Sequence, residues 1–179
     1  MSYIETYQLP EHLSIEFKYL ESLKPSEQHE IMIFGKTHKI PRFQQVFGKD
    51  YVFSNTVSHA LPIPESFFKV IKFFNAKYNC LFNMMLINWY LNGQNYIGMH
   101  SDNEKQIIEN SPIVTISFGA TRKFIVQEKQ TKERTIYPLH HNDVLVMSGE
   151  FQKTHKHGIP KQLNVKDPRI SITLRCFHF

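Results

Sequence analysis

Cysteine and glycine are both scarce in this chain of 179 residues, which contains only two cysteines and seven glycines. The two cysteines, Cys80 and Cys176, cannot build the disulfide framework of a small secreted protein, and they suit a reducing intracellular compartment. The sequence also lacks internal repeats, low-complexity blocks and any charge run long enough to be a linker. We therefore expect a single domain that covers residues 1–179.

Long apolar runs are absent as well. No segment approaches the roughly 20 apolar residues that a membrane-spanning helix requires. The first residues, MSYIETYQLPEHLSIEF, lack the basic segment and following apolar stretch that mark a secretory signal. We therefore expect a soluble intracellular protein with no membrane partner.

The chain is instead rich in apolar and aromatic residues. Hydrophobic residues make up 41% of the sequence and aromatic residues 13%, including 15 phenylalanines. This composition excludes a disordered tail or linker protein and predicts a substantial core. The formal net charge of +5 and the pI of about 9.1 favour a polyanionic partner, but only modestly.

Two segments of the first half have the pattern of helices. The stretch LSIEFKYLESLKPSE predicts a short helix that ends before Pro25. A clearer helix is predicted over residues 64–79, where Pro64 suits the first turn. Between these two segments, HEIMIFGKTHKIPRFQQVFG predicts an apolar strand, then a basic turn, then an irregular segment. One face of the second helix is apolar at helical spacing, and we expect it in the core: Phe67, Ile71, Phe74 and Tyr78.

After Cys80 the pattern changes to short strands rich in β-branched and aromatic residues, separated by turn residues. At least five strands after a helix predict an α+β fold with a mainly β core, a jelly roll buttressed by helices. Such a fold has an open mouth lined by inward side chains. The five strand segments are CLFNMMLINWY, SPIVTISFGA, RKFIVQE, NDVLVMS and RISITLRCF.

His100 and Asp102 are candidate metal ligands because two residues of this spacing leave the same face of a strand. Such a pair occurs often by chance, so a third ligand would be needed. His155 and His157, also two residues apart, are both candidates. Two histidines and one carboxylate around a metal with open positions are typical of non-haem Fe(II) oxygenases.

The segment RISITLR near the C-terminus alternates polar and apolar residues, so Arg169 and Arg175 share one face of the predicted strand. Two arginines inside a barrel would be very costly unless an anion compensates them. A dicarboxylate fits, because guanidinium binds carboxylate in bidentate fashion. Asn88 and Tyr90 also share a face and could donate neutral hydrogen bonds to the same anion. The simpler alternative is an edge strand with solvated arginines.

Taken in order, these motifs resemble the AlkB family of Fe(II)/2-oxoglutarate-dependent nucleic-acid dealkylases over residues 31–178, whereas the first thirty residues match weakly. In combination they are highly specific, since another jelly-roll oxygenase would share only the HxD pair, a distal histidine and an arginine. The resemblance implies a double-stranded β-helix that uses Fe(II), 2-oxoglutarate as cosubstrate, and O2. The matching stretches are INWY, GMHSDNE, SPIVTISFGATRKF, LVM, HGIPK and DPRISITLR.

The resemblance also implies roles for individual residues. His100, Asp102 and His157 would bind the iron, because the distal histidine of the family precedes a turn like that in HGIPK, which His157 does and His155 does not.

For the cosubstrate, Arg169 and Tyr90 would hold the far carboxylate of 2-oxoglutarate. Arg175 and Asn88 would lie near the keto-acid end, which chelates the iron. Ser171 departs from the pattern, because the family has asparagine there.

A nucleotide-recognition lid is expected over residues 31–60, ahead of a jelly-roll core at residues 80–178. The stretch IMIFGKTHKIPRFQQVFG resembles the lid of the duplex-DNA members, and Phe34 occupies the place of their apolar finger. An inserted wedge of this kind can fill the gap left by a flipped base. We expect Lys36, Lys39 and Arg42 to contact phosphates. An ordinary buried strand is the alternative for IMIF.

The stretch DYVFSN matches the segment whose aromatics line the base pocket of the family, which makes Tyr51 and Phe53 candidates for stacking on a flipped base. They could equally be core aromatics. Glu104 matches a pocket acid that contacts the exocyclic edge of the base. Asn103 stands where the duplex-DNA members usually have a second aspartate.

The function expected from this resemblance is oxidative demethylation of N-alkylated bases, such as 1-methyladenine and 3-methylcytosine, in double-stranded DNA. Succinate and formaldehyde would be released. We also expect a monomer, located in the nucleus if the source is eukaryotic and otherwise in the cytoplasm. The alternatives are the same chemistry on RNA or single-stranded DNA, a binding module without turnover, and an oxygenase that acts on protein.

Overall fold

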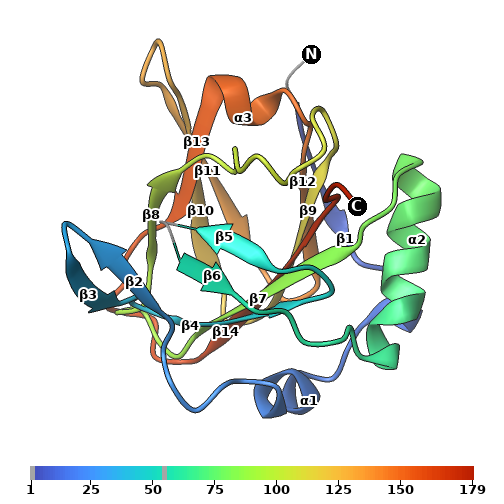
Figure 1. Cartoon of the computed structure of the whole chain (residues 1–179), viewed down its shortest axis with the longest axis horizontal. Coiled ribbons are helices and arrows are strands. Elements are labelled where there is room, and N and C mark those ends of the chain that lie inside the picture. The colour runs from blue at the N-terminus through green and yellow to red at the C-terminus, as the bar shows by residue number, and fades with distance from the viewer. Residues whose placement is uncertain (1–2, 54–55) are drawn as a thin grey trace.

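The computed structural model describes residues 3–53 and 56–179, apart from the side chains of Ile33 and Phe53 (Figure 1). Most of the regular structure is β. The larger sheet has six antiparallel strands, which run in space from β1 at one edge to β4 at the other. Their bounds, in spatial order, are β1 (Ile4–Gln8), β12 (Asp143–Met147), β9 (Ile113–Gly119), β14 (Arg169–Arg175), β7 (Met84–Tyr90) and β4 (Phe43–Phe47).

A second antiparallel sheet of four strands completes the jelly roll. Residues of both sheets line one cavity, so the sheets enclose it between them. This arrangement confirms the predicted fold class. The strands of the smaller sheet, in spatial order, are β11 (Arg134–Leu139), β10 (Arg122–Glu128), β13 (His155–Ile159) and β8 (Ile97–His100).

Helices cover the outer face of the larger sheet. Leu20 of α1 (Phe17–Ser22) and Phe74 of α2 (Phe68–Tyr78) are fully buried in one apolar cluster with residues of β7 and β14. Both predicted helices are therefore confirmed, although the second begins with a 3-10 turn (Glu65–Phe67). The remaining short helices are a 3-10 turn (Glu11–Leu13) and α3 (Phe151–Thr154). No helix in the described part of the chain is long and apolar enough to span a membrane.

Strand β14 shows how one sequence builds both the core and the site. All seven of its residues are buried. Because side chains alternate along a strand, the apolar set packs outward against the helices and the polar set lines the cavity. The apolar set is Ile170, Ile172 and Leu174, and the polar set is Arg169, Ser171, Thr173 and Arg175.

The segment that follows α1 differs from the sequence prediction. It forms a hairpin of β2 (Glu30–Ile33) and β3 (Lys36–Lys39), so the basic residues lie on a strand and not in a turn. The two turn residues, Phe34 and Gly35, have φ of 48° and 73°, as a tight two-residue hairpin requires. The stretch predicted to be irregular contains β4, which pairs with β7.

A second small hairpin is formed by β5 (Tyr51–Phe53) and β6 (Thr56–Ser58), and its Ser58 hydroxyl lies 3.2 Å from Nε2 of His29, the residue before β2. The two hairpins and β4 account for the strands between residues 30 and 58, which is the region predicted to be a lid. Sequence patterns also missed β1, β11 and β13, whose residues are less uniformly apolar than those of the central strands.

Candidate functional site

The site is built around a cavity of about 470 Å³ between the two sheets. The larger sheet contributes side chains from β4, β7, β9 and β14, and the smaller sheet contributes β8, β10 and β13. Residues of the β2–β3 hairpin and the start of β5 complete the lining. The segment predicted to be a lid therefore borders this cavity.

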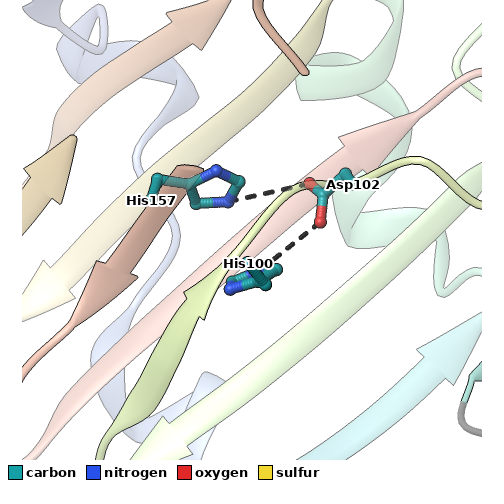
Figure 2. A group of neighbouring side chains, drawn as sticks. All are labelled: His100, Asp102 and His157. Carbon is teal, nitrogen blue, oxygen red and sulfur yellow. Dashed lines mark ion pairs between the residues drawn. The ribbon is translucent and has the colours of Figure 1, made fainter. Parts of the chain in front are cut away.

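Three side chains expected to bind a metal lie together at one end of this cavity. His100 ends β8, Asp102 follows two residues later, and His157 lies on β13 directly opposite His100 in the antiparallel pairing. The candidate ligand atoms are all within 4.8 Å of one another. Figure 2 shows both imidazoles turned toward the Asp102 carboxylate. His100 Nε2 lies 3.5 Å from Asp102 Oδ1, and His157 Nε2 lies 3.9 Å from Asp102 Oδ2.

The structure separates His155 from this group. Its ring stacks on Phe151 at 4.4 Å between centroids, and its Nδ1 is 2.7 Å from the Thr154 hydroxyl. His157 instead stacks on Phe124, which also lines the cavity. Of the two histidines that the spacing left open, His157 is the one placed beside His100 and Asp102.

The charges at this position suit a divalent cation. Burial acts to raise the pKa of Asp102, but the Arg175 guanidinium, whose Nη2 is 3.0 Å away, and the two imidazoles hold that pKa well below its usual value. Burial is the main cause that lowers the pKa of His157 to about 3, against the opposing effect of Asp102. An ionised carboxylate beside a neutral imidazole presents lone pairs to a metal without first having to lose a proton.

Arg169 is a buried cation at the opposite end of β14. Only 1% of it is exposed, its Nη2 donates a 2.7 Å hydrogen bond to the Ser117 hydroxyl, and its guanidinium lies 5.2 Å from the centre of the Tyr90 ring. Burial lowers its pKa to about 10. Within the described residues its Nε and Nη1 have no hydrogen-bond partner and no carboxylate pairs with it. Such a group is stable in a protein only when an anion compensates it.

Comparison with known proteins is consistent with this pairing of a metal triad and an anion site. A family model described as the 2OG-Fe(II) oxygenase superfamily matches residues 1–175. The chain belongs to that superfamily. Its cofactors are accordingly Fe(II) and the cosubstrate 2-oxoglutarate, with O2 as the oxidant.

Relatives place the chain within the AlkB family, as the sequence motifs predicted. It is 30% identical to human DNA oxidative demethylase ALKBH2 over 156 residues, which cover 81% of this chain and 60% of the relative. It is 33% identical to the human alkB homolog 3 dioxygenase over 106 residues, 54% of this chain and 37% of that protein. The chain therefore spans about three fifths of the human ALKBH2 relative.

A solved structure shows the same fold. The structure of OsALKBH1 matches with a TM-score of 0.59 and 18% sequence identity, and the match covers 76% of this chain and 78% of the other. At this identity the likeness supports the jelly-roll architecture alone.

The side chains present fit the cofactors of the 2OG-Fe(II) oxygenases. His100, Asp102 and His157 would hold the iron, and the unpartnered nitrogens of Arg169 match the free carboxylate of a diacid. Asn88, Tyr90 and Ser171 line the same cavity, with Tyr90 paired to Arg169 and Asn88 paired to Ser171 in the β7–β14 register. Every residue that the sequence assigned to the cosubstrate therefore faces one space.

The expected base-pocket residues are only partly described. Tyr51 is 5% exposed, lines the cavity, and donates a 2.5 Å hydrogen bond to Glu104 Oε1. The second Glu104 oxygen is buried and has no hydrogen-bond partner among the described residues. Asn103 is exposed to solvent. The side chain of Phe53, the other predicted aromatic, lies outside the described residues.

The four side chains expected to contact DNA from the predicted lid separate into two groups by their exposure. Phe34, Lys36 and Lys39 are exposed, and Phe34 is completely so. Arg42 does not lie where the sequence predicted, since it is only 6% exposed and faces the cavity. Its Nε donates to Asn88 Oδ1 at 2.9 Å and its Nη2 to Gln44 Oε1 at 3.4 Å. The reason is that β4 begins at Phe43 and pairs with β7, which brings the preceding residue over Asn88.

A hydrogen-bonded clamp that the sequence did not reveal holds the metal ligands in place. The Asp102 amide donates to Gln152 Oε1 at 2.9 Å, and the Ser101 hydroxyl donates to the His155 carbonyl at 2.7 Å. Lys129 Nζ in turn donates to the Gln152 carbonyl. The loop that carries Asp102 is thus fixed to the segment leading into His157, about fifty residues away. No sequence motif signals this contact, because Gln152 belongs to none of the matched stretches.

We expect Gln152→Ala to weaken metal binding about tenfold, since partners that orient the ligands of a metal commonly contribute 10- to 100-fold to its affinity. The reason is that the Asp102 amide would lose its acceptor and the carboxylate would become less ordered. Calorimetric titration of the apoprotein with Mn(II) measures the effect.

Two further variants serve as controls for this titration. Gln152→Glu keeps an acceptor at the same reach and should bind metal nearly as the wild type does. Gln130→Ala changes an exposed glutamine in the β10–β11 turn and should have no effect. An unaltered affinity in a folded Gln152→Ala protein would show that the clamp is unimportant for the metal.

Proposed function

We propose that this chain is an oxidative demethylase of N-alkylated bases, such as 1-methyladenine and 3-methylcytosine, in DNA. The observation that carries the proposal is one cavity that holds the His100, Asp102 and His157 triad together with the buried, unpaired Arg169. A metal and a diacid cosubstrate would lie side by side there. The name of the human relative, DNA oxidative demethylase ALKBH2, supports the choice of substrate.

In this proposal each end of the cavity has its own task. Arg169, beside Tyr90, binds the far carboxylate of 2-oxoglutarate. Arg175 is ion-paired with Asp102 and lies near the keto-acid end with Asn88, so it fixes the carboxylate ligand and adds positive charge for the cosubstrate. When bound, the iron, 2-oxoglutarate and O2 would supply the oxidation of the N-methyl carbon: one oxygen atom would enter succinate as CO2 is lost from the cosubstrate, the other would leave in formaldehyde, and the base would be restored.

The lid would bring the base to this chemistry. A base inside a duplex must leave the stack before its methyl group can reach the metal, at a cost of a few kcal/mol. Tyr51 would stack on the flipped base, and Glu104 has one carboxylate oxygen free to accept from an exocyclic amino group. Lys36 and Lys39, exposed on β3, would contact phosphates.

A preference for double-stranded DNA is part of the proposal. Phe34 stands at the tip of the β2–β3 hairpin, completely exposed, with a positive φ that a bulky residue rarely adopts. Solvent exposure of a phenylalanine on a strained turn has no stabilising role in the free protein. An apolar wedge placed this way could fill the gap left by a flipped base and hold the opposite strand.

The finer expectations about the whole molecule remain part of the proposal. We propose a monomer that acts as a single domain, with a lid at residues 31–60 over a core at residues 80–178. We place it inside the cell, in the nucleus if the source is eukaryotic and otherwise in the cytoplasm. The two unbridged cysteines and the DNA substrate support this location.

The activity itself is tested with oligonucleotides that contain 1-methyladenine. With Fe(II), ascorbate and 2-oxoglutarate, the wild type should restore adenine and release succinate in equal amounts, measured by mass spectrometry. Omitting 2-oxoglutarate should abolish repair, and so should Asp102→Ala, which removes a metal ligand. Succinate formation without base repair would contradict the proposal and favour an oxygenase that acts on protein.

Replacing Phe34 by alanine should lower repair of paired 1-methyladenine at least tenfold and leave repair in single strands within about twofold, because only a duplex needs the gap filled. Phe68→Ala is the matched control, since Phe68 is an exposed phenylalanine of α2 outside the lid. Equal losses on both substrates would instead favour RNA or single-stranded DNA as the natural polymer.

Ser171→Asn should strengthen binding of 2-oxoglutarate about fivefold. The longer amide reaches further into the cavity and adds one hydrogen bond, worth about 1 kcal/mol net. Titration of the Mn(II)-loaded protein with 2-oxoglutarate measures the change. If the affinity for 2-oxoglutarate stays the same, serine at position 171 does not weaken cosubstrate binding, and the prediction is wrong.

A further inference from the structure

Arg42 is a third buried guanidinium in the cavity, and the established motifs leave it unexplained. It is 6% exposed, and burial is the main cause that lowers its pKa. Its two hydrogen-bond acceptors, Asn88 and Gln44, are neutral amides. Among the described residues, no carboxylate lies within ion-pair distance of it. A desolvated cation with only neutral partners points to an anion that belongs beside it.

The surrounding strands form one polar row across the larger sheet. Gln44 of β4 pairs with Asn88 of β7, Asn88 pairs with Ser171 of β14, and Ser171 pairs with Ser117 of β9. Adjacent strands lie about 4.8 Å apart, so the Gln44 backbone is roughly 10 Å from that of Ser171. Side chains reaching from both positions can therefore contact one ligand that lies over Asn88.

The hydrogen bond from Arg42 also fixes the orientation of Asn88. Because Asn88 Oδ1 accepts from the Arg42 Nε, the amide Nδ2 is the group left to donate. Gln44 is arranged in the same way, with Oε1 facing Arg42 and a buried Nε2 that has no partner among the described residues. Both amides thus present donors.

Donors are also in excess elsewhere in the cavity. The buried nitrogens without a hydrogen-bond partner in the described residues include Gln44 Nε2, Arg169 Nε and Nη1, and Arg175 Nε. The buried carboxylate oxygens without a hydrogen-bond partner in the described residues are fewer: Glu104 Oε2, and Asp102 Oδ1, which lies 3.0 Å from Arg175 Nη2 in an ion pair. A ligand that satisfies this cavity must be rich in acceptor oxygens and negatively charged.

The geometry points to Arg42 and Gln44 as cosubstrate-binding residues: together they supply, from the edge strand β4, the donors that the short Ser171 cannot supply from β14. This inference rests on the proposed function, since 2-oxoglutarate is the dianion. Arg42 adds a positive charge and orients the Asn88 amide toward the ligand, and Gln44 Nε2 donates to a ligand oxygen. The amide donor that an asparagine at position 171 would supply is then replaced by donors from Arg42 and Gln44, which lie on the other side of Asn88.

A phosphate of the bound DNA is the competing anion for Arg42. To reach it, Arg42 would have to leave both of its hydrogen bonds and expose the Asn88 and Gln44 amides to the cavity without partners. Binding of Arg42 to a DNA phosphate is less favourable, because it would break the two hydrogen bonds that the Arg42 guanidinium donates to Asn88 and Gln44. The experiment below separates the two ligands directly.

The test is calorimetric titration of 2-oxoglutarate into the Mn(II)-loaded full chain, without DNA. We expect Arg42→Gln to raise the Kd for 2-oxoglutarate about tenfold and Gln44→Leu to raise it about threefold. Arg42→Lys, which keeps the charge but loses the planar donor fork, should fall between the wild type and Arg42→Gln. Mn(II) affinity and the melting temperature, measured on the same samples, should change little.

Matched controls lie on the same strand and on the surface. Gln45→Leu changes the next residue of β4, which is half-buried on the opposite face and whose amide donates to the Val46 carbonyl. Lys72→Gln removes an exposed positive charge on α2. Both should bind 2-oxoglutarate as the wild type does.

A second arm uses the serine. In the Gln44→Leu background, Ser171→Asn should lower the Kd for 2-oxoglutarate about tenfold, because the amide donor then comes from β14. In the wild-type background its gain should be smaller than in the variant. Equal gains in both backgrounds would show that the two positions act independently and would overturn the compensation.

Binding of a methylated oligonucleotide, followed by fluorescence anisotropy, is measured in parallel. If Arg42→Gln leaves the 2-oxoglutarate Kd unchanged but weakens oligonucleotide binding, Arg42 serves the phosphate and the inference is wrong. If the wild type itself does not bind 2-oxoglutarate, the proposed function fails before the role of Arg42 is reached. The two failures are therefore distinguishable.

Discussion

The ion pair between Asp102 and Arg175 joins the two parts of the molecule on which the site depends. Asp102 lies on an irregular loop after β8, whereas Arg175 ends β14, a central strand held between β7 and β9. Both side chains are buried, so removing either partner would leave an uncompensated charge, a loss of about 3–5 kcal/mol. The loop that carries Asp102 is thereby tied to a central, fully buried strand of the sheet, and Arg169 lies at the other end of that same strand.

The polar residues that line the cavity lower the stability of the fold, and in return they provide a binding site. Unpartnered buried donors each cost about 1–3 kcal/mol, and the larger sheet carries several of them on its inner face. The outer face of the same strands offsets this cost, because Ile170, Ile172 and Leu174 pack against the helices. The alternation of a β-strand therefore separates the two requirements residue by residue. A helix at this position could not place a continuous core and a continuous anion site on opposite faces so cleanly.

Sequence reasoning succeeded where a local pattern carried the information. Strands β7, β9, β10, β12 and β14 were visible because their β-branched and aromatic residues are dense, and the metal ligands were visible because a motif fixes their spacing. Arg42 was misplaced because nothing local to PRFQQ distinguishes an exposed basic segment from an edge strand; its burial follows from the pairing of β4 with β7. Gln44 and Gln152 were missed for the same reason, since their partners Asn88 and Asp102 are 44 and 50 residues away.

The loop after His100 is held from two sides, and this connects the β5–β6 hairpin to the metal ligands. On one side Gln152 and His155 hold the Asp102 segment. On the other, Tyr51 bonds to Glu104, and the Gln106 side chain bonds to the backbone of Asp50 and Val52 at the start of β5. The β5–β6 hairpin and the Asp102 carboxylate are therefore anchored to one short stretch of chain, residues 100–106. A displacement of the β5–β6 hairpin would therefore reach Glu104, two residues from Asp102, through these hydrogen bonds and the short covalent connection.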